Sequence, residues 1–130
     1  MKPGELEVRH EEDNGRHVLR LVGELDLASA DGLEQRIGRL CVEGSREIVL
    51  DLSELDFVDS SGLRAMLTSR QTCERSGCEL VLVNCKEQVR RVLELTGIDG
   101  VLHTREEAPA SGAQAPRRDA SERGRAAAAD

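Results

Sequence analysis

Aromatic side chains are nearly absent from this chain of 130 residues, which has no Trp, no Tyr and a single Phe, Phe57. Basic residues are outnumbered as well: 18 Lys and Arg stand against 25 Asp and Glu, a formal net charge of −7. Nucleic-acid-binding proteins use clustered basic residues, often with aromatic platforms on which bases stack. The composition therefore argues against nucleic acid as a partner, and the acidic charge argues against an anionic membrane surface.

Long hydrophobic runs are missing too. The longest lie near residues 48–52 and 80–83, whereas a helix needs about 20 apolar residues to cross a bilayer. The first residues, Met1-Lys-Pro-Gly-Glu5, show no hydrophobic signal region. We therefore expect a cytoplasmic protein with no membrane association.

The chain also lacks the common ligand and cofactor motifs. Cys41, Cys73, Cys78 and Cys85 form no C-x-x-C pair and have no histidines beside them, so neither a zinc site nor a disulfide framework is indicated. Buried, reduced thiols are the simpler interpretation. Neither G-x-G-x-x-G nor a Walker-type motif occurs. We expect no metal and no cofactor.

Composition divides the chain near its C-terminal end. Residues 1–104 carry 13 basic and 20 acidic residues and thus the whole net charge. Residues 105–130 contain nine alanines and no Val, Ile, Leu, Met or Phe. Such a segment cannot bury enough apolar surface to offset its ordering entropy. We predict one domain over residues 1–104 and a disordered Ala/Arg-rich tail over residues 105–130.

Periodicity within the domain predicts alternating strands and helices. Apolar residues alternate on both sides of an Asn14-Gly15 step, which is typical of an antiparallel hairpin. Helical spacing over residues 33–41 follows, behind Ser29 as the expected N-cap. The later elements are expected as a strand at 47–51, a helix that starts beside Ser60 and stops around Gly77, a strand at 80–83, a helix around 89–97 and an edge strand at Val101-Leu102.

Strands that alternate with helices imply right-handed crossovers and parallel pairing, to which the hairpin adds an antiparallel strand. We therefore predict an α/β fold, with a mixed β-sheet of about 4–5 strands flanked by about 3–4 α-helices.

Two adjacent serines mark the most informative segment, from Asp51 to Leu67, where a buried strand meets an amphipathic helix. The first N–H groups of a helix lack internal partners, and its dipole places about half a positive charge there, so a phosphate fits. Ser60 and Ser61 are thus candidate phosphorylation sites. Alternatively, one of them simply caps the helix.

Acidic residues follow two successive strands. Glu24 and Asp26 lie after the second strand, and the loop from Asp56 to Gly62 follows the next. If these strands run parallel, both loops emerge at the sheet edge where open α/β sheets bind ligands. The alternative is that these carboxylates are solvated turn residues or local caps. A serine hydrolase is not indicated, because the G-x-S-x-G elbow is absent.

At these residues the chain closely resembles the anti-sigma factor antagonists of the STAS domain superfamily, which act in bacterial partner-switching systems for sporulation and general stress. The resemblance rests on Gly23-Glu-Leu-Asp26 and on Asp51-Leu-Ser-Glu-Leu-Asp-Phe-Val-Asp-Ser-Ser-Gly-Leu63. It extends from about Leu6 to Leu102.

The resemblance implies a regulatory switch and not an enzyme. In this family the unphosphorylated antagonist binds an anti-sigma factor that is also a serine kinase, and so frees the sigma factor. The kinase then phosphorylates the first serine of Asp-Ser-Ser-Gly, and a PP2C-type phosphatase reverses this. Ser60 matches that serine. The partner-binding residues that the resemblance implies are Glu24, Asp26, Asp59, Ser61, Gly62 and Arg64.

Arg64 departs from the family pattern, in which many relatives have a small residue after Gly-Leu. It pairs with the phosphate or with an acidic partner, or it is an ordinary exposed helix arginine. An alternative function also stays open: a non-enzymatic STAS subunit of a transporter or signalling scaffold, without obligatory phosphorylation. The sequence leaves the oligomeric state open.

Overall fold

The hairpin predicted from the sequence opens the computed structural model, which describes residues 5–105. Strands β1 (Leu6–Asp13) and β2 (Arg16–Leu25) pair antiparallel. Between them, Asn14 and Gly15 both have positive φ, 55° and 83°, which is the backbone of a type I′ turn and matches the twist of the flanking strands.

Helices and strands alternate after the hairpin, as the periodicity predicts. The further elements are α1 (Leu27–Val42), β3 (Glu47–Val58), α2 (Ser60–Arg75), β4 (Glu79–Val83), α3 (Glu87–Thr96), the 3₁₀ turn η1 (Ile98–Gly100) and β5 (His103–Arg105). The sheet has the order β1-β2-β3-β4-β5, and β2 to β5 pair in parallel. The predicted mixed α/β fold is confirmed.

β3 is longer than predicted. It continues past Asp51 to Val58, because two register irregularities let β2 and β3 stay paired as far as Leu25 opposite Val58. Asp56, expected in a loop, therefore lies within a strand.

The C-terminal boundary also differs from the prediction. Val101 and Leu102 are not a strand, because their N–H groups both donate to the Ile98 carbonyl at 2.9 Å and so complete the 3₁₀ turn. The edge strand begins at His103 and includes Arg105. Arg105, assigned to the predicted tail, thus belongs to a strand, and residues 106–130 lie outside the described residues.

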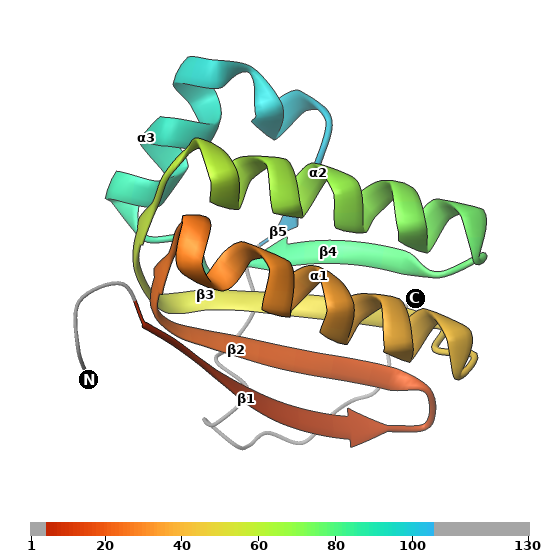
Figure 1. The fold of residues 1–130 in the computed structure, drawn as a ribbon. Coiled ribbons are helices and arrows are strands. Elements are labelled where there is room, and N and C mark those ends of the chain that lie inside the picture. The colour runs from red at the N-terminus through yellow and green to blue at the C-terminus, as the bar shows by residue number, and fades with distance from the viewer. Residues whose placement is uncertain (1–4, 106–130) are drawn as a thin grey trace.

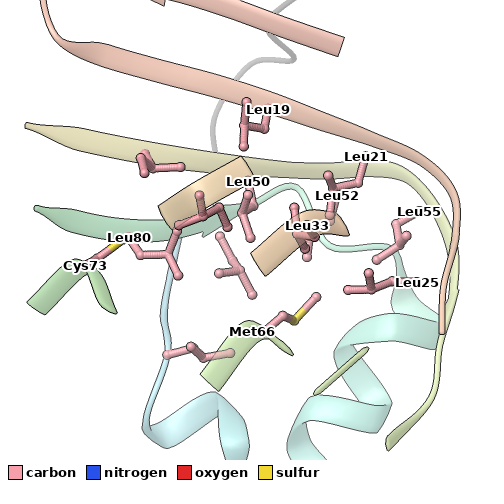
Figure 2. Close-up of a cluster of buried hydrophobic side chains, with 14 of the residues drawn as sticks. Leu19, Leu21, Leu25, Leu33, Leu50, Leu52, Leu55, Met66, Cys73 and Leu80 are labelled. Atoms are coloured by element: carbon pink, nitrogen blue, oxygen red, sulfur yellow. The ribbon is translucent and has the colours of Figure 1, made fainter. Parts of the chain in front are cut away.

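The main hydrophobic core lies between the sheet and the helices (Figures 1 and 2). Helices α1 and α2 run side by side over one face of the sheet (Figure 1). Figure 2 shows Leu25 and Leu55 at one end of this core, with Cys73 and Leu80 at the other. The helix stripe predicted from spacing is buried as expected, at Leu33, Ile37, Leu40 and Cys41.

The opposite face of the sheet carries a smaller cluster of valines. Val49, Val81 and Val83 are buried there with Val18 beside them, because successive residues of a strand point to opposite faces. Within residues 5–105, no helix is both long and apolar enough to cross a membrane.

Candidate phosphorylation and partner-binding site

The ends of β2 and β3 bring the two predicted loops together. Leu25, the last residue of β2, pairs with Val58, and its carbonyl accepts a hydrogen bond from the Asp59 N–H at 3.2 Å. Asp26 and Asp59 each follow these residues directly, so they stand at the starts of the neighbouring helices α1 and α2 (Figure 1). The expectation that both loops emerge at one sheet edge is confirmed.

At the start of α1 the N-cap is Asp26 and not Ser29. The Asp26 Oδ1 atom accepts from the Ala28 N–H at 3.0 Å, and the Ser29 Oγ atom accepts from the Asp26 N–H at 3.0 Å. These bonds form a capping box. The prediction for Ser29 is wrong because β2 runs directly into α1, which places Ser29 three residues inside the helix. Its hydroxyl also donates to the Glu24 carbonyl at 3.0 Å.

At the start of α2 the N-cap is Asp59. Its Oδ1 atom accepts from the Gly62 N–H at 3.0 Å, and its carbonyl accepts from the Leu63 N–H at 2.9 Å. The interpretation of Ser60 or Ser61 as the N-cap is therefore wrong. Ser60 is the first helical residue and is exposed, and its hydroxyl has no hydrogen-bond partner within residues 5–105.

The surroundings of Ser60 suit an added phosphate. In the described part of the chain, the N–H groups of Ser60 and Ser61 have no hydrogen-bond partner, as expected for the first turn of a helix. Arg64 is exposed one turn further on, and no carboxylate among the described residues pairs with it. Side chains at positions i and i+4 share a helix face. A phosphate on Ser60 would lie at the positive end of the helix dipole, on the helix face that carries Arg64.

Gly62 is buried, and its lack of a side chain serves the packing of the chain itself. A Cβ atom there would lie 2.5 Å from the Leu25 carbonyl oxygen and 2.7 Å from Val58 Cγ2. The group that approaches Gly62 closely is therefore the end of β2. Gly62 fixes where α2 begins, and so where Ser60 is presented.

Two exposed apolar residues beside the acidic ones escaped the sequence analysis. Leu27, next to Asp26, is 78% exposed, and Phe57, which pairs with Glu24 across β2 and β3, is 48% exposed. The one aromatic residue of the chain, close to the serines, was the available signal for Phe57. The sequence held no such signal for Leu27, because the position of Leu27 at the helix start depends on which residue caps α1.

The remaining carboxylates are placed as follows. Glu24, expected after the second strand, is instead half-buried within β2, which continues to Leu25. Asp56 is exposed on β3 and forms an ion pair with Lys86, the residue before α3. Lys86 therefore partly neutralises the negative charge of Asp56. In this respect Asp56 differs from the two aspartates at the helix starts.

Known proteins match the chain over most of its length. Residues 6–109 match the family model of the STAS domain. BtrV of Bordetella bronchiseptica, named as a candidate anti-sigma factor antagonist, is 36% identical over 101 residues, which cover 75% of this chain and 87% of BtrV. The anti-sigma-B factor antagonist of Staphylococcus aureus is 25% identical over 90 residues, with coverages of 69% and 83%.

A solved structure agrees with these matches. The crystal structure of an anti-sigma factor antagonist from Mycobacterium paratuberculosis superposes with a TM-score of 0.70 at 27% identity, over 79% of this chain and 87% of that one. Sequence and fold point to the same group, and the chain belongs to the STAS domain family.

Proposed function

We propose that this chain is an anti-sigma factor antagonist that phosphorylation of Ser60 switches off. The unphosphorylated form binds an anti-sigma factor and so releases the sigma factor. The observation that carries the proposal is the cap of α2: because Asp59 provides it, the Ser60 hydroxyl stays exposed at a helix N-terminus. The names of the relatives, which include anti-sigma factor antagonists, support it.

The proposed docking area, called here the switch surface, combines apolar and acidic groups at the starts of α1 and α2. Leu27 and Phe57 supply the apolar contacts that dominate binding energy once water is excluded. The carboxylates steer a basic partner and fix its orientation. The members of the switch surface are Glu24, Asp26, Leu27, Phe57, Asp59, Ser60, Ser61 and Arg64.

Phosphorylation acts through charge at this surface. A phosphate on Ser60 adds a charge of about −1.5 to −2. The N–H groups of the first turn and Arg64 hold it, so the fold survives. For a partner, however, a surface that already carries Asp26 and Asp59 becomes more negative and bulkier. Repulsion and desolvation then weaken binding, and each tenfold loss of affinity needs only about 1.4 kcal/mol.

The proposal includes the enzymes that add and remove the phosphate but gives this chain no catalytic role. The serine kinase is the anti-sigma factor itself, and a PP2C-type phosphatase removes the phosphate. Because a sigma factor works on RNA polymerase, the proposed site of action is the cytoplasm.

Mass spectrometry after a kinase reaction tests the proposal. The full-length chain is incubated with its anti-sigma factor kinase and ATP, and the phosphate is located. We expect a single phosphate on Ser60 and none in Ser60→Ala. Ser29→Ala and Ser61→Ala are matched controls that keep the site. A phosphate on another serine would contradict the assignment, and stable binding of the chain without any phosphorylation would favour the scaffold function.

A further inference from the structure

Three cysteines from separate parts of the sequence meet at the end of the helices away from the switch surface. Cys41 lies in the last turn of α1, Cys73 in the last turn of α2, and Cys78 just before β4. All three are buried, and their Sγ atoms lie within 4.8 Å of one another, with Cys41 and Cys73 at 3.6 Å. Figure 2 shows Cys73 at the end of the core opposite Leu25.

The spacing of the three sulfur atoms fits a single bound metal ion. A metal–thiolate bond of about 2.3 Å places three sulfur atoms around one ion in a triangle with edges of about 4 Å. Cys41 and Cys73 are 3.6 Å apart at their sulfur atoms, and no pair in the cluster exceeds 4.8 Å, which is compatible with that value. Small side-chain movements therefore bring all three within bonding distance.

The electrostatic setting disfavours free thiolates at this position. α1 ends at Val42 and α2 ends at Arg75, so the negative ends of both helix dipoles lie near the cluster. Burial raises the pKa of the Cys78 thiol to about 11 and also raises the pKa of Cys73. Without a cation these thiols stay protonated and are poor nucleophiles, which argues against a role in disulfide exchange.

A buried hydroxyl without a partner lies on the same helix as Cys73. Ser69 Oγ has no hydrogen-bond partner among the described residues, although Ser69 is only 1% exposed. It stands one turn before Cys73 on the same side of α2. A buried polar group that lacks a partner is costly.

We propose that Cys41, Cys73 and Cys78 bind one Cu(I) ion. Three soft sulfur donors select a soft ion. Within residues 5–105 no histidine, carboxylate or further thiol joins the cluster, and a structural zinc site would need four ligands. Each Cu–S bond forms as the thiol proton leaves to solvent, and copper stays in the +1 state throughout.

A competition titration tests the site. The reduced full-length chain is titrated anaerobically with Cu(I) in the presence of a Cu(I)-specific chelator, and bound copper and the sulfur-to-copper charge-transfer absorption are measured. We expect one equivalent per chain. Failure of the folded wild-type chain to bind copper would overturn the proposal, and so would preferential binding of Zn(II) in a parallel titration.

Variants assign the ligands. Cys41→Ser, Cys73→Ala and Cys78→Ser should each weaken Cu(I) binding by at least about tenfold, since even changes outside the ligand set cost about that much. Cys85→Ser is the matched control, because Cys85 lies beyond β4 and outside the cluster. Equal copper binding by the cluster variants and the control would overturn the assignment. Because Cys78 lies next to the exposed Ser76-Gly77 turn, its variant is the one expected to keep the fold best.

Discussion

The β2–α1 and β3–α2 junctions lie side by side, and each uses an aspartate as N-cap, but their serines have different environments. In Asp26-Leu-Ala-Ser29 the serine is three residues after the cap and completes a capping box. In Asp59-Ser-Ser-Gly62 a glycine takes that third position, and the serines stand where no bond within the helix uses them. The offset between cap and serine thus separates a structural hydroxyl from one that a kinase can reach.

The two junctions also differ in their glycines, which gives the largest expected effect on stability. Gly62→Ala puts a Cβ atom 2.5 Å from the Leu25 carbonyl oxygen, and overpacking of this kind costs about 1–3 kcal/mol. Gly32→Ala in α1 meets no atom within 4 Å and should stabilise by about 0.5–1 kcal/mol. Urea unfolding measures both. Equal stability of the two variants would show that the end of β2 does not hold the start of α2.

The aspartate caps should contribute equally at both junctions. Asp26→Ala and Asp59→Ala each remove the acceptor of a first-turn N–H, and we expect each to lower the free energy of unfolding by about 0.5–2 kcal/mol. The corresponding Asn variants keep the cap and serve as controls. If only Asp26→Ala were destabilising, α2 would have another cap, and the exposed state of Ser60 would need a new explanation.

The serines of the two junctions should differ clearly in their contribution to stability. Ser29→Ala loses a half-buried hydroxyl with bonds to Asp26 and Glu24, at a cost of about 0.5–1.5 kcal/mol. Ser60→Ala loses an exposed hydroxyl and should stay within about 0.5 kcal/mol of wild type. Thermal unfolding of the two variants at equal concentration measures the contrast. A similar loss in both would mean that Ser60 is structural.

The smallest expected effect comes from charge on the switch surface. Asp26→Asn keeps the cap of α1 but removes a negative charge beside the proposed kinase contact. We expect Ser60 phosphorylation to slow by a few-fold at low salt, with a difference that shrinks as salt rises. Initial rates across a salt series measure this. Unchanged rates at every salt concentration would make Asp26 a capping residue only.

Periodicity predicted the parts of the fold that repeat. The stripe from Leu33 to Cys41 and the Asn14-Gly15 turn lie where expected, because burial enforces helical spacing and a tight turn needs positive φ. The cap of α1 was not predictable in this way. Aspartate and serine are nearly equal as N-caps. Asp26 is the cap because the pairing of β2 with β3 continues to Leu25, so that Asp26 is the next residue after the strand.

The cysteine cluster could not be predicted from the sequence, for a related reason. Cys41 and Cys73 lie 32 positions apart, and only the packing of α1 against α2 brings their sulfur atoms together. No local spacing in the sequence indicates such a contact. The closeness of Asp26 and Asp59 was predictable, by contrast, because parallel strands place their ends at one sheet edge.

Calorimetric titration of the anti-sigma factor with the two states of this chain tests the central claim most directly. One sample is unphosphorylated, and the other carries a stoichiometric phosphate on Ser60 with its fold verified by circular dichroism. We predict tight binding of the unphosphorylated sample and a Kd at least about 100-fold higher for the phosphorylated one, a change of about 2.8 kcal/mol in the free energy of binding. Equal dissociation constants for the two folded states would contradict the account.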